Sequence, residues 1–339
     1  MNLRNNYAAD MFSILYIEEE VWDHPYTKAI VERYPHAVKV PIAHYQDIFD
    51  RIHQNYRIQK DSRALIIAAK HGTRIYHGAP VCQNFDEQYF YYCCTALNCI
   101  YDCSYCWLKG MYPTAHLVVF VNLEDFFDDI RALLKQHPVY LCIAYETDLL
   151  PLESIIHQVQ HWHTFAKKEQ NLTIELRTKC ASIHTLEKLE SLDNFILAYT
   201  LSPDTVIRTM EKGTPALMER IHAINWCIDH DFPVRLCFDP LLYIPEAKEQ
   251  YKEMAETVVR NVDLSRVRDI SIGMFRMSNK YLKNMRKRFP DAAVVQYPYE
   301  TDEGYAHYPR HIIKEMEGAL IEVLLPYTKA EKIYREKEL

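Results

Sequence analysis

The chain has 339 residues, of which 49% are hydrophobic and 25% are charged, and its formal net charge is −7 at pH 7. This composition is typical of a globular protein, and the length exceeds one ordinary compact core unless that core is an α/β barrel. No apolar run approaches the roughly 18 residues that cross a bilayer. The N-terminus lacks a secretory pattern. Composition thus excludes the membrane, disordered and fibrous classes and predicts a cytoplasmic protein.

Glycine is scarce, with only seven residues in the chain. No two of them have G-x-G spacing, and the closest pair misses the spacing of a phosphate-binding P-loop. We therefore expect neither a dinucleotide fingerprint nor a Walker-type loop. The negative net charge argues against a uniformly basic nucleic-acid binder, although a local basic patch can act against the global sign.

Taken in chain order, the first 80 residues predict a small α/β cap, with β-like runs at 12–17 and 65–69 and a helix over about 26–34. From about residue 88, strand and helix patterns alternate. The predicted strands cover 89–93, 139–144, 172–176, 195–200, 234–238 and 270–274. Amphipathic helical patterns separate them, most clearly at 123–134, 152–162 and 217–228.

Six strand-helix units with nearly continuous apolar strands predict a parallel sheet that is covered by helices. Six units rather than eight indicate an incomplete barrel, in which catalytic groups lie at the C-terminal ends of the strands. The predicted fold class is α/β, a partial (β/α)6 TIM-type barrel with a small N-terminal α/β cap and a C-terminal hairpin and helix. The expected domains are 1–85, 86–290 and 291–339.

The cysteines are the most informative residues, because six of the ten fall between positions 82 and 106. In a chain without an export signal, clustered cysteines indicate metal or redox chemistry rather than disulfides. Directly after the first predicted barrel strand, Cys99, Cys103 and Cys106 form a C-x3-C-x2-C motif. Three thiolates on a tight loop can hold three corners of a [4Fe–4S] cube and leave the fourth iron open to another ligand.

The same thiols allow a second interpretation, a structural zinc site that takes Cys93 or Cys94 as its fourth ligand. Such zinc sites usually join two ligand pairs across a longer gap than this spacing provides. Cysteines on or directly after a strand are more often small buried side chains than ligands. The spacing therefore favours the iron–sulfur interpretation.

The cysteine loop ends in CSYCWLKG, and further segments along nearly the whole chain carry a resemblance to one family. They include ILYIEEEVWDHPYTKAIVERY, RALIIAAKHGTRIY, VVFVNLED, YETD, RTKCASIHTLEKL, LSPDTVIRTMEKGTPALMERIHA and FDPLLYI. These segments resemble the spore photoproduct lyase family of radical S-adenosylmethionine enzymes. The resemblance implies a [4Fe–4S] cluster, S-adenosylmethionine and a carbon–carbon lyase. That lyase repairs a methylene-bridged thymine dimer in DNA through a 5′-deoxyadenosyl radical.

The resemblance also implies partners and site residues. The partners are DNA and a reducing protein such as flavodoxin or ferredoxin, and no membrane is involved. The three motif cysteines become the cluster ligands. The candidates for cofactor binding lie at strand ends and are Thr147, Asp148, Lys179, Ser182 and Ser202. Residues of these types are also common caps at strand-helix junctions, and Lys179 is the strongest candidate because a lysine in an apolar-flanked segment needs an anionic partner.

One position departs from the family pattern. The family's hydrogen-donating cysteine at the end of the second barrel strand corresponds to Tyr145. Cys142 lies three residues earlier, where a strand period of two predicts that it faces the opposite side. The candidate catalytic residues are therefore Tyr145, the second thiol Cys180, and Trp107, which replaces a tyrosine of the family. Two alternatives stay open, a paralogous enzyme with another substrate and a non-catalytic, metal-stabilised DNA-binding module.

A local basic run predicts contact with nucleic acid. It contains Arg276, Lys280, Lys283, Arg286, Lys287 and Arg288, with no acidic residue among them. On a helix these side chains would form a positive face that neutralises phosphates, whereas the alternative is an ordinary solvated helix. A tyrosine-rich segment follows and offers Tyr305 as a wedge beside a flipped-out lesion. Packing explains these tyrosines nearly as well.

Overall fold

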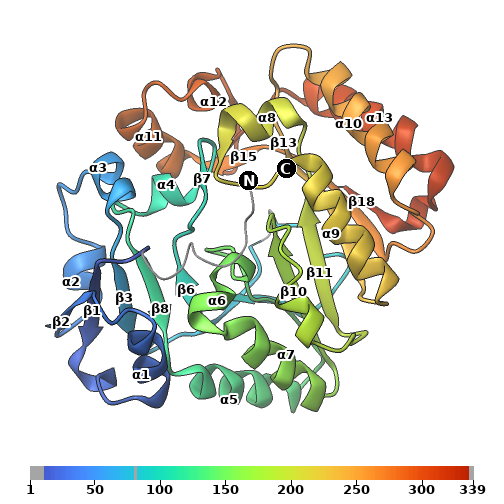
Figure 1. Cartoon of the computed structure of the whole chain (residues 1–339). Helices are drawn as coiled ribbons and strands as arrows, with labels where there is room; N and C mark the ends of the chain where they lie inside the picture. The colour runs from blue at the N-terminus through green and yellow to red at the C-terminus, as the bar shows by residue number, and fades with distance from the viewer. Residues whose placement is uncertain (1–10, 80–81, 336–339) are drawn as a thin grey trace. The chain divides into compact units, whose positions relative to one another are not determined.

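The computed structural model describes residues 11–79 and 82–335. Helices and strands alternate along most of this range, so the fold is of the mixed α/β class that the sequence predicts (Figure 1). The chain divides into two compact units. The first comprises Met1–His77, Tyr89–Ile100 and Met111–Ile174, and the second comprises Gly78–Gln88, Tyr101–Gly110 and Glu175–Leu339. Strand β10 (Leu172–Thr178) begins in the first unit and ends in the second.

The first unit contains a five-stranded sheet in the order β2-β1-β3-β8-β6 (Figure 1). Its strands are β1 (Ile14–Glu18), β2 (Val38–Ile42), β3 (Leu65–Ala68), β8 (Leu117–Phe120) and β6 (Ala96–Leu97). All pairs are parallel except β6 with β8. The connecting helices are α1 (Pro25–Glu32), α2 (Gln46–Phe49) and α3 (Tyr56–Asp61). This confirms the predicted cap strands and helix, whereas β8 was not predicted.

The same unit carries β4 (Ile75–His77), β5 (Phe90–Cys93) and β9 (Val139–Cys142). β4 is antiparallel to β5, and β5 is parallel to β9. The unit also contains α5 (Leu123–Leu134), α6 (Glu153–Ile156) and α7 (Gln158–Lys168). The single helical pattern predicted over 152–162 is broken between α6 and α7, because His157 adopts a left-handed backbone with φ 45°.

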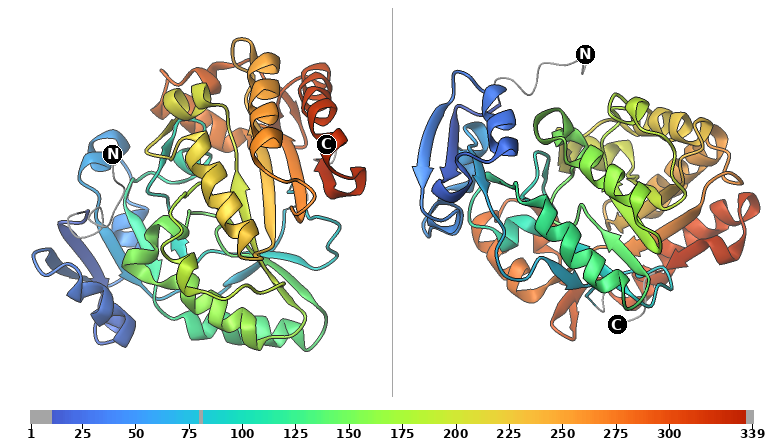
Figure 2. Two further views of the ribbon diagram at one scale, coloured as in Figure 1. Left: turned by 45° about the vertical axis from the view of Figure 1, so that its right-hand side comes forward. Right: turned by 90° about the horizontal axis from the view of Figure 1, so that it is seen from below.

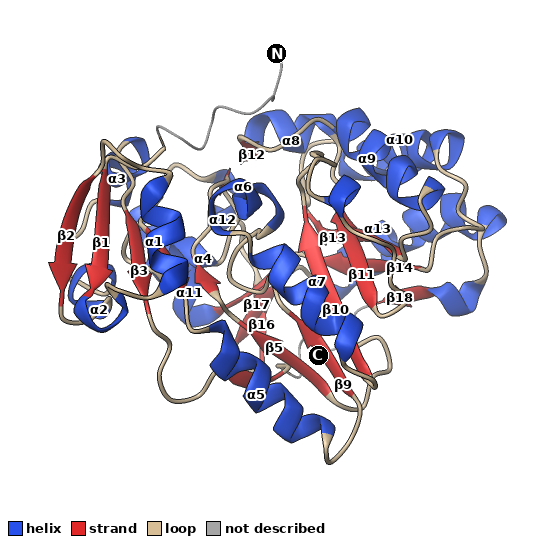
Figure 3. Ribbon diagram, turned by 60° about the horizontal axis from the view of Figure 1, so that its bottom comes forward, coloured by secondary structure: helices blue, strands red, loops and turns tan. Residues whose placement is uncertain are grey.

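The second unit contains four neighbouring parallel strands (Figure 3). They are β11 (Phe195–Thr200), β13 (Val234–Leu241), β14 (Asp269–Met274) and β18 (Ile333–Arg335). The helices α8 (Asp204–Met210), α9 (Leu217–Asp229), α10 (Ala247–Asn261) and α13 (Arg310–Leu324) belong to this unit. α10 and α13 lie side by side (Figure 2), and the ion pairs Lys248–Glu315 and Lys252–Glu322 connect them. All six predicted barrel strands are thus present, as β5, β9, β10, β11, β13 and β14.

The predicted C-terminal hairpin is confirmed as part of a three-stranded antiparallel sheet. Its strands are β15 (Arg276–Ser278), β16 (Glu300–Asp302) and β17 (Tyr305–His307). Glu303 and Gly304 form the turn with φ 47° and 86°, and glycine takes this left-handed backbone at no steric cost. Between β15 and β16 lie α11 (Asn279–Arg288) and α12 (Ala293–Gln296). No helix in the described part of the chain is long and apolar enough to span a membrane.

Candidate active site

The cysteine loop is fixed by a short strand pair of the second unit. β7 (Asp102–Cys103) pairs antiparallel with β12 (Glu211–Lys212), which sets Cys103 opposite Glu211. The Ser104 amide donates a hydrogen bond to Met210 O at 2.7 Å, and the Cys106 amide donates to Cys103 O at 3.2 Å. The helix α4 (Leu108–Met111) follows directly. The segment around residue 211 therefore holds the backbone at the second motif cysteine, and a turn within the loop ties the third cysteine to the second.

The donor set suits an iron–sulfur cluster better than zinc. Cys99, Cys103 and Cys106 are reduced cysteines, and two of the three are half-buried rather than buried. Burial raises the pKa of Cys93 and of Cys94, which disfavours the thiolate that zinc requires. Within residues 11–79 and 82–335, no group of three or more His, Cys, Asp and Glu side chains is assembled for a metal ion. The fit of the cluster therefore rests on the chemistry of the three motif thiols.

Glu211 is an acidic centre within the second unit, next to the cysteine loop. It is fully buried and accepts hydrogen bonds from the Tyr105 hydroxyl, from Ser202 Oγ at 2.8 Å and from Arg220 Nη2 at 2.5 Å. Burial opposes ionisation, but the positive charges of Lys179 and Arg220 outweigh it and lower the pKa of Glu211 to about 2. A stable carboxylate thus connects the cysteine loop with two predicted cofactor residues.

Lys179 and Ser202 already have partners within the protein. Lys179 Nζ lies 5.9 Å from the centre of the Tyr105 ring, and its charge acts on Glu211. The anionic partner that the sequence requires for Lys179 is therefore supplied by the chain. Neither Glu211 nor Tyr105 was predicted, but Arg220 gave a usable signal, because it falls on the apolar stripe of α9.

The remaining predicted residues at strand ends differ in burial and in their hydrogen-bond partners. Thr147 Oγ1 is buried and has no hydrogen-bond partner among the described residues. Such an orphaned hydroxyl can bind a polar group of a cofactor. Asp148 is buried in the same unit, whereas Ser182 is exposed. Cys180 is buried, and its sulfur accepts a hydrogen bond from the Ser182 amide at 3.4 Å.

Tyr145 stacks on Tyr92, with ring centres 4.1 Å apart and an angle of 24° between the rings. Tyr92 is also the register partner of Cys142, so the side chains of Tyr92 and Cys142 leave the same face of the sheet. The prediction that Cys142 and Tyr145 face opposite sides is therefore wrong. β9 ends at Cys142, and the period of two does not continue through the irregular residues that follow.

Trp107 lies against α11. Its ring is parallel within 24° to that of Tyr281, at a centre distance of 6.0 Å. The approach of α4 to α11 is so close that a Cβ on Gly110 would lie 2.4 Å from Tyr281 O. Asn284 Nδ2 donates to Gly110 O at 2.8 Å and reinforces the contact. The helix after the cysteine motif is therefore attached to the basic helix.

The basic run divides into structural arginines and exposed lysines. Arg286 donates to Val295 O and Tyr297 O, and Arg288 donates to Lys109 O. The exposed lysines are Lys280, Lys283 and Lys287, which share one face of α11 at spacings of three and four. Arg276 is half-buried in β15, and Tyr305 is half-buried in β17. The neighbouring tyrosines pack on one another, with centre distances of 4.8–5.0 Å among Tyr297, Tyr299 and Tyr308.

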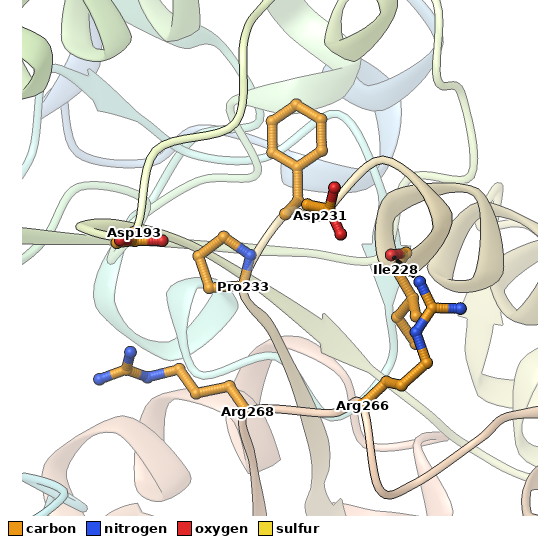
Figure 4. A pocket seen from close by; sticks show the side chains of 7 residues that line it. Asp193, Ile228, Asp231, Pro233, Arg266 and Arg268 are labelled. Atoms are coloured by element: carbon orange, nitrogen blue, oxygen red, sulfur yellow. Dashed lines mark hydrogen bonds between the residues drawn. The ribbon is translucent and has the colours of Figure 1, made fainter.

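One cavity of the second unit lies away from these residues (Figure 4). Asp193, Asp231 and Pro233 line it where the chain enters β11 and β13, at the ends opposite to those that lead to Ser202. Its two arginines are paired, Arg266 with Asp229 at 2.8 Å and Arg268 with Asp269 at 3.3 Å. Its position and charge balance separate it from the candidate active site.

The comparison with known families decides the assignment. A family model described as spore photoproduct lyase matches residues 11–311. The chain belongs to this family. One solved spore photoproduct lyase variant, with bound AdoMet and dinucleoside spore photoproduct, gives a TM-score of 0.81 at 16% identity over 97% of this chain and 99% of that one. A spore photoproduct lyase complexed with dinucleoside spore photoproduct gives 0.80 at 16% identity over 96% and 98%.

No curated protein matches the chain by sequence. The resemblance to the spore photoproduct lyase family is confirmed by the family match, and the solved lyases share the fold along almost the whole length. At 16% identity this likeness shows the fold and does not assign roles to individual residues.

Proposed function

We propose that the chain is a radical S-adenosylmethionine lyase that repairs a thymine-dimer lesion in DNA. The observation that carries this proposal is the C-x3-C-x2-C motif of three reduced cysteines, Cys99, Cys103 and Cys106, in a member of the spore photoproduct lyase family. These thiolates would hold a [4Fe–4S] cluster. With S-adenosylmethionine, the bound cluster supplies a 5′-deoxyadenosyl radical that abstracts hydrogen from the lesion.

The roles of the chain's residues follow from their contacts. Thr147 Oγ1 would bind a polar group of S-adenosylmethionine, because it is buried without a partner in the described residues. Glu211 would hold Tyr105 and Lys179 in place, because it accepts a hydrogen bond from the Tyr105 hydroxyl and balances the charge of Lys179. Asp148, Ser182 and Ser202 complete the candidate set, in a sheet that we infer to be the partial barrel.

DNA is the expected partner at the exposed face of α11. Lys280, Lys283 and Lys287 present three charges on that face, and Arg276 and Tyr305 lie on strands of the adjoining hairpin sheet. Contacts to phosphates release counterions and make binding depend on salt. A reducing protein such as flavodoxin or ferredoxin would deliver the electron.

One observation favours a related alternative, a paralogue that acts on another nucleic-acid lesion. The resemblance aligns Tyr145 with the family's donor cysteine, and in the structure the Tyr145 ring stacks on that of Tyr92. A phenol transfers its hydrogen atom to a carbon-centred radical more slowly than a thiol does, so hydrogen return from Tyr145 would be slower than from a cysteine. The two alternatives differ in substrate and share the first radical step.

Anaerobic reconstitution tests the proposal. We expect about four iron and four sulfide per chain, and 5′-deoxyadenosine when the protein is reduced with S-adenosylmethionine. Replacing any motif cysteine by alanine should abolish both, whereas Cys227→Ala, a buried cysteine of α9, should not. Tightly bound zinc without 5′-deoxyadenosine would instead support the non-catalytic module. Product analysis on defined dithymine lesions then separates repair from the paralogue.

A further inference from the structure

Three tyrosines of the first unit form one continuous stack. The ring of Tyr145 lies on that of Tyr92 at 4.1 Å and 24°, and Tyr92 lies on Tyr76 at 5.2 Å and 19°. The strand register explains the second contact, because Tyr76 of β4 is the antiparallel partner of Tyr92 of β5. Offset stacking at these distances brings π-systems into direct contact.

The stack lies on the more open face of its strands. Tyr92 and its register partner Cys142 are half-buried, whereas Cys93 and Leu141, which point to the other face, are fully buried. A residue facing the open side can meet a substrate or a small solute, which a residue in the packed face cannot.

The two ends of the stack differ. Tyr145 lies after the end of β9, where the family presents its hydrogen donor. Tyr76 lies on β4, and its hydroxyl donates to Thr73 O at 2.8 Å among exposed groups. The stack thus connects the candidate donor position with the surface of the unit.

We propose that Tyr92 and Tyr76 restore Tyr145 after it has given a hydrogen atom to the product radical, a relay that rests on the proposed function. In the first step the Tyr145 O–H bond breaks and a C–H bond forms on the product. The phenoxyl left on Tyr145 then takes one electron from Tyr92 and one proton from water, while Tyr92 loses its hydroxyl proton to water.

Tyr76 reduces Tyr92 in the same way and is itself restored by a small thiol in solution. The thiol S–H bond breaks, the hydrogen atom re-forms the Tyr76 O–H bond, and two thiyl radicals from two turnovers combine to a disulfide. One thiol hydrogen is therefore consumed for each product, and the protein ends each cycle with three intact phenols.

The first test uses the reconstituted enzyme on a defined dithymine lesion with excess thiol. Tyr92→Phe and Tyr76→Phe should leave 5′-deoxyadenosine formation unchanged but lower repaired product per 5′-deoxyadenosine by about tenfold, since phenylalanine cannot carry the radical. Tyr91→Phe is the matched control, because Tyr91 directly precedes Tyr92 in β5 and its side chain lies on the opposite face of the strand. It should keep the wild-type ratio.

The second test needs no cofactor. In cluster-free protein with 3-aminotyrosine in place of Tyr145, a one-electron oxidant added in solution should form an aminotyrosyl radical, detected by electron paramagnetic resonance. Adding Tyr92→Phe should slow its formation by about tenfold relative to Tyr91→Phe. Equal rates would overturn the relay.

The outcomes separate the relay from the proposed function. Absence of 5′-deoxyadenosine from the wild-type enzyme would contradict the function, while the cluster-free experiment would still decide the relay. Unchanged product ratios in Tyr92→Phe would overturn the relay alone. If the ratio of repaired product to 5′-deoxyadenosine fell in Cys142→Ala but not in Tyr76→Phe, the radical would leave the stack through Cys142. That result would overturn the role assigned to Tyr76.

Discussion

Two buried glutamates, Glu211 in the second unit and Glu146 in the first, share a tyrosine hydrogen-bond donor but have opposite pKa shifts. Each accepts a hydrogen bond from a tyrosine hydroxyl, Glu211 from Tyr105 and Glu146 from Tyr112. Burial raises the pKa of Glu146, and the hydrogen bonds from Tyr112 and Cys94 do not reverse it. The pKa of Glu211 is lowered to about 2.

The difference comes from the cations. Arg220 forms a fully buried ion pair with Glu211, and Lys179 adds a second positive charge. At Glu146, the charge of Lys70 lowers the pKa, but by less than the hydrogen bonds from Tyr112 and Cys94 do. Neutral hydrogen bonds therefore do not offset the effect of burial on the pKa of a carboxyl group, whereas nearby cations do. This makes Glu211 a fixed anion beside the cysteine loop.

The largest expected effect is on stability when this anion is removed. Glu211→Gln leaves the Arg220 guanidinium buried without a counter-charge, and we expect a loss of about 3–5 kcal/mol in the free energy of unfolding. Urea unfolding followed by circular dichroism measures it. Glu146→Gln is the matched control, and it should change stability by about 1 kcal/mol or less. Equal losses in both variants would contradict the role of the cation.

Replacing both partners of the ion pair sharpens the comparison. In Glu211→Gln combined with Arg220→Met, no fully buried charge is left unpaired, and only the half-buried Lys179 loses its counter-charge. We therefore expect at least about 2 kcal/mol of the single-variant loss to be recovered. A double-mutant cycle by urea unfolding measures the coupling. Additive losses would show that Glu211 and Arg220 do not act as a pair.

The tyrosines that donate to the two glutamates, Tyr105 and Tyr112, should differ less in their contributions to the free energy of unfolding. Tyr105→Phe removes a hydrogen bond to a charged acceptor and should cost about 1.5–3 kcal/mol, whereas Tyr112→Phe should cost about 0.5–1.5 kcal/mol. Both hydroxyls are buried, so the comparison is matched in burial. Thermal unfolding of the two variants in the same buffer ranks them. A larger loss of stability in Tyr112→Phe would contradict the opposite pKa shifts of the two carboxyl groups.

Much of the fold was predictable because buried parallel strands form continuous apolar runs. VRLCF at 234–238 and FILAYT at 195–200 are such runs, and both became strands. β8 has the same character but was not predicted, although β3, which is equally short, was. A short apolar run gives no periodicity that distinguishes a strand from a buried helix segment. The discontinuous units also lie beyond local patterns, which do not report the pairing of distant strands.

The site was predictable only where the motif is local. The cysteine spacing is visible within eight residues, whereas the partners of Glu211 come from separate segments, Tyr105 over a hundred residues earlier. The stack of Tyr145 on Tyr92 depends on a register and on a strand end, and neither is encoded in one short window. Arg220 was the usable exception, because a charge on an apolar stripe requires a buried counter-charge.

The smallest expected effect is the pH dependence that distinguishes the two glutamates. The lowered pKa of Glu211 gives stability that is present above about pH 4.5, the ordinary glutamate value, and is lost as the pH falls toward 2. The raised pKa of Glu146 gives the opposite pH dependence: its contribution to stability is present below the ordinary glutamate value and is lost as the pH rises through the folded-state pKa.

Urea midpoints of the wild type and both glutamine variants, measured between pH 2.5 and 7, test these two pH dependences. Each unit of pKa difference corresponds to about 1.4 kcal/mol of stability. The difference in stability between the wild type and Glu211→Gln should become smaller as the pH is lowered. The stability of Glu146→Gln should rise relative to that of the wild type as the pH approaches neutrality. Parallel curves would mean that neither carboxyl changes its ionisation between the folded and unfolded chain.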